Sequence, residues 1–231
     1  MNPMNWMKVL AVGALSIGLF SSATPIPATA QELPKIYDAS MPHEQQITLA
    51  ESAAPAAVSS HATIYILGPK GYEKARQGTN GFSCFVERHF LTPTETTIAP
   101  QCLDAEGSRT LLVVYLHAEE LRSNGRSEAE IKEDAASGYK EGRYQIPSKP
   151  GLLYMMSSEN RLSLTSGKSN GIFPPHLMFY APNMTAKDIG FDSQQPLDDL
   201  DYMGMTHPGQ GDNLIVVIPQ TSTAPATPAA R

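Results

Sequence analysis

The chain has 231 residues, and its 23 acidic and 17 basic side chains give a formal net charge of −6. A mildly acidic chain without a basic cluster lacks the electrostatic signature of a protein that binds nucleic acid or an anionic membrane surface. About 200 residues after N-terminal processing are enough for one domain with its own core, and only marginally enough for two. We therefore expect a single domain that has neither nucleic acid nor membrane among its partners.

Residues 1–30 have the organisation of a secretory signal peptide. Lys8 follows a short polar start, an apolar run extends from Val9 to Phe20, and Ala28-Thr29-Ala30 has the small-x-small pattern of a cleavage site. The apolar run spans about 12 residues, whereas a membrane-spanning helix needs roughly 20. We expect an exported protein, periplasmic or extracellular, that is soluble and free of the membrane in its mature form.

Composition divides the rest of the chain into three parts. Residues 31–60 mix Gln, Pro, Ala and Ser, and Pro55 interrupts a brief helical pattern, which predicts a linker and one short helix. Residues 61–220 are expected to form a single α+β domain. The tail, 221–231, is mostly Pro, Ala and Thr. Such a composition buries too little apolar surface to offset the entropy of ordering, so we expect a disordered tail.

Three short β-like runs with turn residues between them occupy the chain from Ala62 to Arg88; in order they read ATIYILG, YEKARQ and FSCFVER. Asn80-Gly81 supplies the positive φ angles that tight hairpins require, so we expect a β-meander. The middle run alternates weakly, which predicts an edge strand or one with a solvated face. The expected inward positions are Ile64, Ile66, Phe82, Cys84 or Phe85, and Val86.

Cys84 and Cys102 are the only two cysteines. In an exported protein an even pair indicates a disulfide, and closing a loop of this size stabilises the fold by roughly 3 kcal/mol in the chain-entropy account. The alternative is a cysteine nucleophile served by His89 or His117, but the chain has no local signature of a known thiol enzyme. We expect the disulfide.

The hydrophobic period becomes helical from Thr110, where apolar residues recur at helical spacing: Leu111, Val114, Ala118 and Leu121. Gly125 is placed to end this helix. Ser127 and Glu130 have the spacing of a capping box before a second helix, which Gly142 ends. The pattern therefore predicts a helical hairpin.

Strand-like runs return after Pro150, at 151–157, at 161–165, within 171–182 and at 213–219. The runs LLYMM and LIVVI do not alternate, so we expect both of their faces to be covered. Strands, then helices, then strands predict an α+β fold, with a largely antiparallel sheet and the helical hairpin packed on one face.

His176 is the first candidate functional residue because it follows Pro174-Pro175 and precedes an apolar run. Histidine is the side chain most readily used as a base, acid or ligand near neutral pH. The prolines would hold it at a strand entry, where a cleft could open. The alternative is structural, since prolines commonly precede the first residue of a strand.

Met203, Met205 and His207 alternate along the chain. In an extended segment all three would point one way and offer sulfur and imidazole ligands, which suit Cu(I). Methionines at alternate positions also serve as core filler. A composite site would require this segment to lie beside His176.

Glu159 and Arg161, in the polar cluster after the run at 151–157, are two further catalytic candidates for a pocket beside His176. The chain has no His-Glu-x-x-His helix motif, and export, ordinary size and the lack of a catalytic signature favour binding over catalysis. We expect an exported binding or interaction domain without a cofactor, whose partner is an unknown small molecule or protein. The alternative is a hydrolase-like enzyme or a metal protein, with copper as the metal, centred on His176 and His207.

Overall fold

A computed structural model of the chain describes residues 37–88, 98–161, 174–190, 203–205 and 214–217. The predictions for the leader at 1–30 and the tail at 221–231 lie outside these residues. None of the helices in these ranges is both long enough and apolar enough to cross a membrane.

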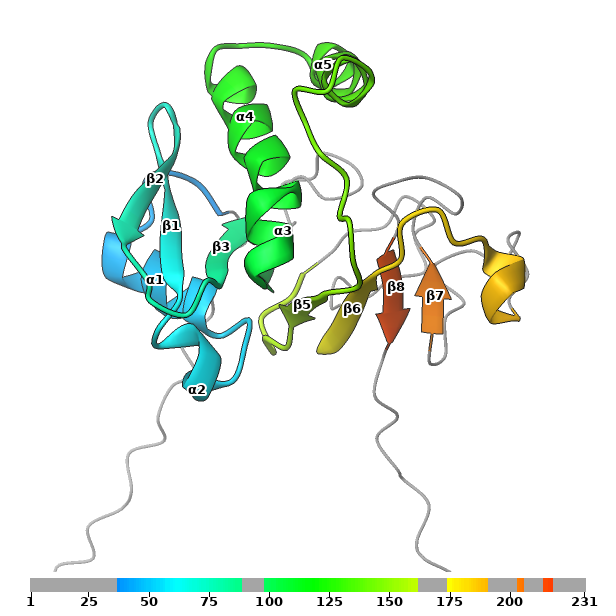
Figure 1. Cartoon of the computed structure of the whole chain (residues 1–231). Helices are drawn as coiled ribbons and strands as arrows, with labels where there is room; N and C mark the ends of the chain where they lie inside the picture. Colours follow the sequence, from blue (N-terminus) through cyan, green and yellow to red (C-terminus); the bar gives the residue numbers. More distant parts are fainter. Residues whose placement is uncertain (1–36, 89–97, 162–173, 191–202, 206–213, 218–231) are drawn as a thin grey trace, which may run out of the picture. The chain divides into compact units, whose positions relative to one another are not determined.

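The described residues form a mixed sheet accompanied by several helices, which confirms the α+β class (Figure 1). The strand order is β2-β1-β3-β4-β5-β6-β8-β7. The strands are β1 (Thr63–Gly68), β2 (Gly71–Arg76), β3 (Ser83–Glu87), β4 (Ala99–Leu103), β5 (Leu152–Met155), β6 (His176–Tyr180), β7 (Met203–Met205) and β8 (Leu214–Val217). The helices are α1 (His43–Glu51), α2 (Ala56–Ser59), α3 (Ala105–Arg109), α4 (Leu111–Ser123), α5 (Glu128–Lys140) and the 3-10 helix η1 (Ala186–Ile189).

The first three strands do not form the expected meander. β1 pairs with β2 in antiparallel fashion, but β3 runs parallel to β1 on its other side. The chain between β2 and β3 therefore passes the start of β1, where Thr79 N donates to His61 O at 2.8 Å. Gly78 makes this passage possible, because a Cβ there would lie 2.2 Å from Thr63 N. Asn80-Gly81 therefore lies in a connection that crosses to the other side of β1, and not in a hairpin turn. β2 lies at the edge of the sheet, as expected.

The two predicted helices are present as α4 and α5. Ser127 and Glu130 form the predicted capping box at the start of α5. Gly125 and Gly142, each just beyond the end of a helix, have positive φ angles of 79° and 77°. α4 contacts β2, and α5 contacts α4.

Residues 37–60 contribute more to the fold than the expected linker and one short helix. Both α1 and α2 are formed in this segment. α1 contacts β1, β3 and β4, and its Leu49 and Ala50 are buried in the core. The helical pattern of this segment is weak, and α1 is stabilised mainly by its packing against the sheet.

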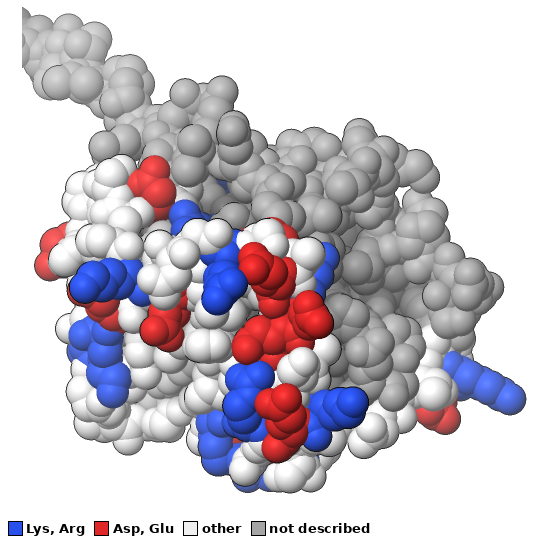
Figure 2. All heavy atoms as spheres, turned by 90° about the horizontal axis from the view of Figure 1, so that it is seen from above, with Lys and Arg blue, Asp and Glu red and all other residues white. Residues whose placement is uncertain are grey.

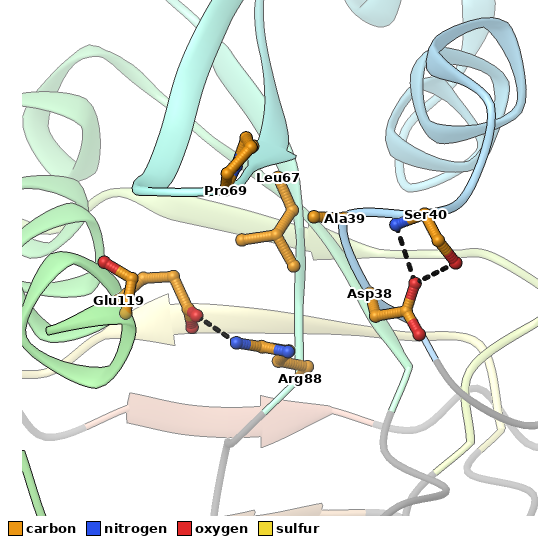
Figure 3. Close-up of a pocket in the computed structure, with 9 residues that line it drawn as sticks. Asp38, Ala39, Ser40, Leu67, Pro69, Arg88 and Glu119 are labelled. Carbon is orange, nitrogen blue, oxygen red and sulfur yellow. Dashed lines mark hydrogen bonds and ion pairs between the residues drawn. The ribbon is translucent and has the colours of Figure 1, made fainter. Parts of the chain in front are cut away.

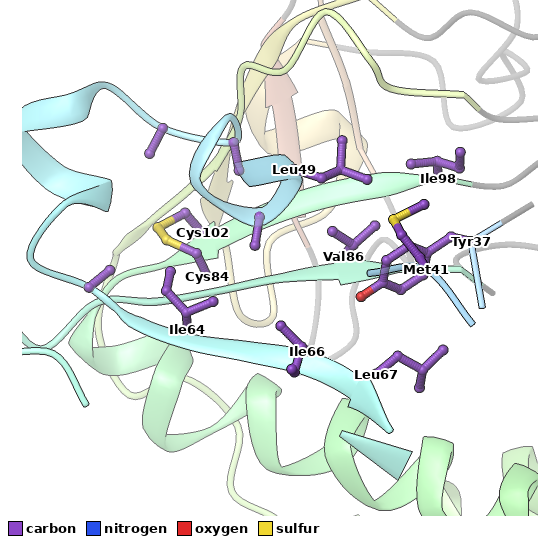
Figure 4. Packing of buried hydrophobic residues seen from close by; sticks show 14 residues of the cluster. Tyr37, Met41, Leu49, Ile64, Ile66, Leu67, Cys84, Val86, Ile98 and Cys102 are labelled. Carbon is purple, nitrogen blue, oxygen red and sulfur yellow. A yellow bond between two sulfur atoms is a disulfide. The ribbon is translucent and has the colours of Figure 1, made fainter. Parts of the chain in front are cut away.

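The core has two clusters, one on each face of the sheet. In the first, α1 packs against buried residues of β1, β3 and β4, among which the disulfide between Cys84 and Cys102 lies (Figure 4). The two cysteines are directly opposed on the antiparallel strands β3 and β4. The predicted inward positions Ile64, Ile66, Cys84 and Val86 all belong to this cluster, while Phe85 belongs to the other. The bonded sulfurs also exclude a free cysteine nucleophile.

The second cluster lies under α3 and α4 and continues across β5, β6 and β8. Along β5 and β8, buried residues alternate with half-buried ones. The expectation that both faces of these strands are covered therefore holds in part, because one face is buried and the other is half-buried. An apolar strand can be buried on both faces, but how much of each face is buried depends on the helices and strands that pack against it.

Candidate functional site

A pocket of about 350 Å³ lies where β1, β3 and α4 meet the segment before α1 (Figure 3). It is lined by Asp38, Ala39, Ser40, Leu67, Gly68, Pro69, Arg88, Glu119 and Ser123. The lining combines charged groups with a short apolar wall, and its volume lies in the range of small-molecule sites.

One buried glutamine, Gln46 of α1, fixes two walls of this pocket. Its Nε2 donates to Met41 O at 3.0 Å and to Leu67 O at 3.2 Å. Its Oε1 accepts from Tyr37 Oη at 2.6 Å and from Leu67 N at 2.7 Å. The residues on either side of Asp38–Ser40 and the end of β1 are therefore bonded to the same fully buried side chain. This arrangement forms the walls before any ligand arrives.

A chain of ion pairs fixes the charged side of the pocket. Arg88 Nη2 donates to Glu119 Oε1, and Glu119 is 2% exposed. Arg122 Nη1 donates to the other oxygen of Glu119 at 3.3 Å, and its Nε and Nη2 donate to Glu128 at 2.7 and 3.0 Å. Because Glu119 is held from two sides, it positions the Arg88 guanidinium.

Glu87 is a second buried carboxyl group near this network. Gln101 Nε2 donates to Glu87 Oε2 at 2.7 Å. Burial raises the pKa of Glu87 to about 8, and the charges of Glu119 and Glu128 add to the rise, while Arg122 and Gln101 oppose it. Glu87 is therefore protonated at neutral pH and adds no charge beside the pocket.

Asp38 is the anionic group on the opposite side of the pocket. Its Oδ1 accepts from Ser40 N at 2.8 Å and from Ser40 Oγ. These hydrogen bonds lower the pKa of Asp38, with a smaller contribution from the charge of Arg88. Figure 3 shows Arg88 between Glu119 on one side and Asp38 on the other. The pocket thus presents a fixed cation and a fixed anion to the same space.

The structure places His176 in the core. It is 1% exposed at the start of β6, opposite Met155 of β5. Its Nδ1 donates to Pro174 O at 2.7 Å. Burial lowers the pKa of His176 to about 4, so the imidazole is neutral at physiological pH.

Glu159 and Arg161 lie after β5, where Arg161 Nη2 is 3.7 Å from Glu159 Oε2. Both side chains are more than a third exposed. The backbone of Arg161 also pairs with Ile98. The structure thus brings these two candidates together in a surface ion pair.

Met203 and Met205 lie in β7, which β8 separates from β6 and His176. His207 lies outside the described residues. The composite site of these residues with His176 therefore remains a prediction. Within the part of the chain that the structure describes, no group of three or more His, Cys, Asp or Glu side chains could hold a metal ion.

Two short serine motifs have the spacing of known nucleophile signatures. Gly167-Lys168-Ser169-Asn170-Gly171 has Gly-x-Ser-x-Gly spacing and lies outside the described residues. The strand β6 begins five residues after Gly171, although a nucleophile elbow requires a helix there. Ser137-Gly138-Tyr139-Lys140 lies in α5 with Ser-x-x-Lys spacing, and among the described residues no hydrogen bond joins its serine and lysine side chains.

Comparison with known proteins yielded no match among family models, curated proteins or solved structures. Sequence reasoning did not anticipate the pocket, because its lining comes from four separate segments. The one local signal is Asp38-Ala39-Ser40, since an aspartate followed two residues later by serine favours an Asx turn.

Proposed function

We propose that this chain is an exported binding domain that holds a small polar molecule in the pocket between Asp38, Leu67, Arg88 and Glu119. The observation that carries the proposal is the preformed lining. Gln46 bonds two walls together, and a buried carboxylate fixes the arginine. Rigid walls reduce the conformational entropy that is lost when a ligand binds.

The surroundings of the pocket favour a small molecule over a large charged partner. Acidic and basic side chains are interleaved on the face seen in Figure 2. At the two ends of α5, for example, Arg126 pairs with Glu130 at 3.0 Å, and Arg143 pairs with Asp134 at 3.2 Å. Such a surface creates little net field, so long-range attraction of a polyanion is weak.

The leader pattern at 1–30 and the disulfide support export to the periplasm or the extracellular space. An oxidising compartment is where such a bond persists. The helix α4 has a role in this proposal, because it packs on the second core cluster and carries Glu119 and Ser123 to the pocket.

The proposal is tested by titrating the ¹⁵N-labelled protein, purified after export, with pools of small acids, amines, zwitterions and sugars. We expect one pool to shift amide resonances around residues 38–40, 67–69 and 88. Ala39→Phe fills the pocket from an exposed position and should abolish the shifts. Ala57→Phe, exposed on α2 and outside the pocket, should not. Shifts that survive Ala39→Phe, or no shifts with any pool, would overturn the proposal.

A further inference from the structure

We infer that the ligand of this pocket is a zwitterion of amino acid or dipeptide size, whose carboxylate binds Arg88 and whose ammonium group binds Asp38. The inference rests on the proposed function and names the chemical class of its ligand. It is carried by the unused donors of Arg88, the unused oxygen of Asp38 and the apolar wall between them.

Arg88 provides the site for the carboxylate. Only its Nη2 donates to a side chain, that of Glu119. Its Nε is buried and has no hydrogen-bond partner among the described residues, and no bond from Nη1 to a described residue is formed. Because Nε is buried, the donors that a ligand can reach are those of Nη1 and the remaining N–H of Nη2, which form the planar end of the guanidinium that carboxylates accept.

Asp38 provides the site for the ammonium group. Both hydrogen bonds from Ser40 go to Oδ1. Over the described ranges, no group donates to Oδ2. Ser40 therefore orients the carboxylate and keeps it ionised, while one oxygen remains available to a donor from the ligand.

The charges near the pocket distinguish a zwitterion from a simple ion. Glu119 offsets Arg88, and Glu128 offsets Arg122, so the formal charge of these four groups together with Asp38 is −1. A simple anion at Arg88 would face both Asp38 and Glu119. A simple cation would neutralise Asp38 but leave the unbonded Nη1 of Arg88 without an acceptor. A ligand with both charges pairs each fixed group with its opposite.

Leu67 and Pro69 line the pocket together with these charged groups, and Figure 3 shows Leu67 above Arg88. An apolar surface made of two side chains favours a ligand with a short hydrocarbon side chain. Leucine and glycyl-leucine meet all three requirements and serve as probes.

The test compares leucine and glycyl-leucine with N-acetyl-leucine, which lacks the ammonium charge, and leucinamide, which lacks the carboxylate. Binding is measured by calorimetry and located by amide shifts. We expect at least one zwitterion to bind in the pocket, and both blocked analogues to bind at least tenfold more weakly. Asp38→Asn should remove the preference for leucine over N-acetyl-leucine. Glu44→Gln, which neutralises an exposed acid of α1 outside the pocket, should preserve it.

The outcomes separate the two proposals. Equal binding of the blocked analogues, or pocket binding only by a compound that is not a zwitterion, would overturn the inference and leave the proposed function standing. A preference that persists in Asp38→Asn would also overturn it. Ser40→Ala provides a second variant that retains the charge of Asp38, and it should weaken zwitterion binding. If no compound from any class binds in the pocket, both proposals fail.

Discussion

The two halves of the sheet differ in how they are covered. In the helix-covered region, β2, β1, β3 and β4, α1 packs on one face and α4 on the other. In the half-covered region, β5, β6 and β8, burial alternates strictly along the strands, and Phe179 is 40% exposed. The pocket lies in the first region. Helices on both faces bring side chains from distant segments together, whereas the second face of β5, β6 and β8 is only partly covered.

Each region also buries a titratable group whose pKa is shifted, and the two shifts have opposite directions. Glu87 in the helix-covered region has a pKa raised to about 8, and His176 in the half-covered region has a pKa lowered to about 4. Desolvation is the main cause of both shifts, because it disfavours the charged form of either group. Both groups are therefore neutral near pH 7, which is the condition that permits their burial.

The largest difference between the regions should appear in a pair of phenylalanines. Phe85 is fully buried and packs edge-on against Tyr72, with ring centroids 5.6 Å apart. Phe85→Ala should cost about 3–5 kcal/mol of unfolding free energy, and Phe179→Ala less than about 1 kcal/mol. Urea unfolding measures both. Equal losses would show that the two regions are covered alike.

The disulfide comes next in size and tests how the helix-covered region is held together. Replacing both Cys84 and Cys102 by alanine should cost roughly 3 kcal/mol, because the unfolded chain gains entropy when the loop is opened. Urea unfolding again measures the loss. Mass spectrometry with and without reductant should show a difference of about two protons in the parent protein. Free thiols in protein purified after export would contradict the prediction.

Glu87→Gln tests the buried carboxyl group. Between the unfolded pKa of 4.5 and the folded pKa of about 8, only the folded chain holds the proton. Stability should therefore fall as pH rises through this window, by up to about 1.4 kcal/mol per pH unit. The variant should lose this slope and exceed the parent in melting temperature at pH 8. An unchanged slope would exclude Glu87 as its source, and Glu73→Gln, at an exposed position of β2, is the matched control.

His176→Met tests the half-covered region at the other end of the pH range. Between pH 6.5 and about 4, only the unfolded chain binds a proton at this histidine. Stability should therefore fall as pH decreases through that window, again by at most about 1.4 kcal/mol per pH unit. The variant should flatten this part of the melting-temperature profile, whereas His61→Gln, at an exposed site, should not. If the melting temperature of His176→Met still falls as strongly as that of the parent on acidification, other groups cause the loss of stability.

Local patterns predicted much of the secondary structure. Spacings within a few residues predicted the capping box of Ser127 with Glu130 and the buried strand positions Ile64, Ile66, Cys84 and Val86. The cysteine count predicted the disulfide. The register of β1 against β3 did not follow, because Gly78 fits a hairpin loop as well as a crossing until the backbone of Thr63 lies against it.

The sequence by itself determined the α+β class, the two helices α4 and α5 and the disulfide, because periodicity, caps and cysteine count are local properties. Tertiary structure alone decided the candidate site. Asp38, Leu67, Arg88 and Glu119 are scattered along the chain, and no spacing relates them. They meet because Gln46 ties α1 to the end of β1 and because α4 places Glu119 against the end of β3. Contacts between distant segments depend on packing, which a local pattern does not encode.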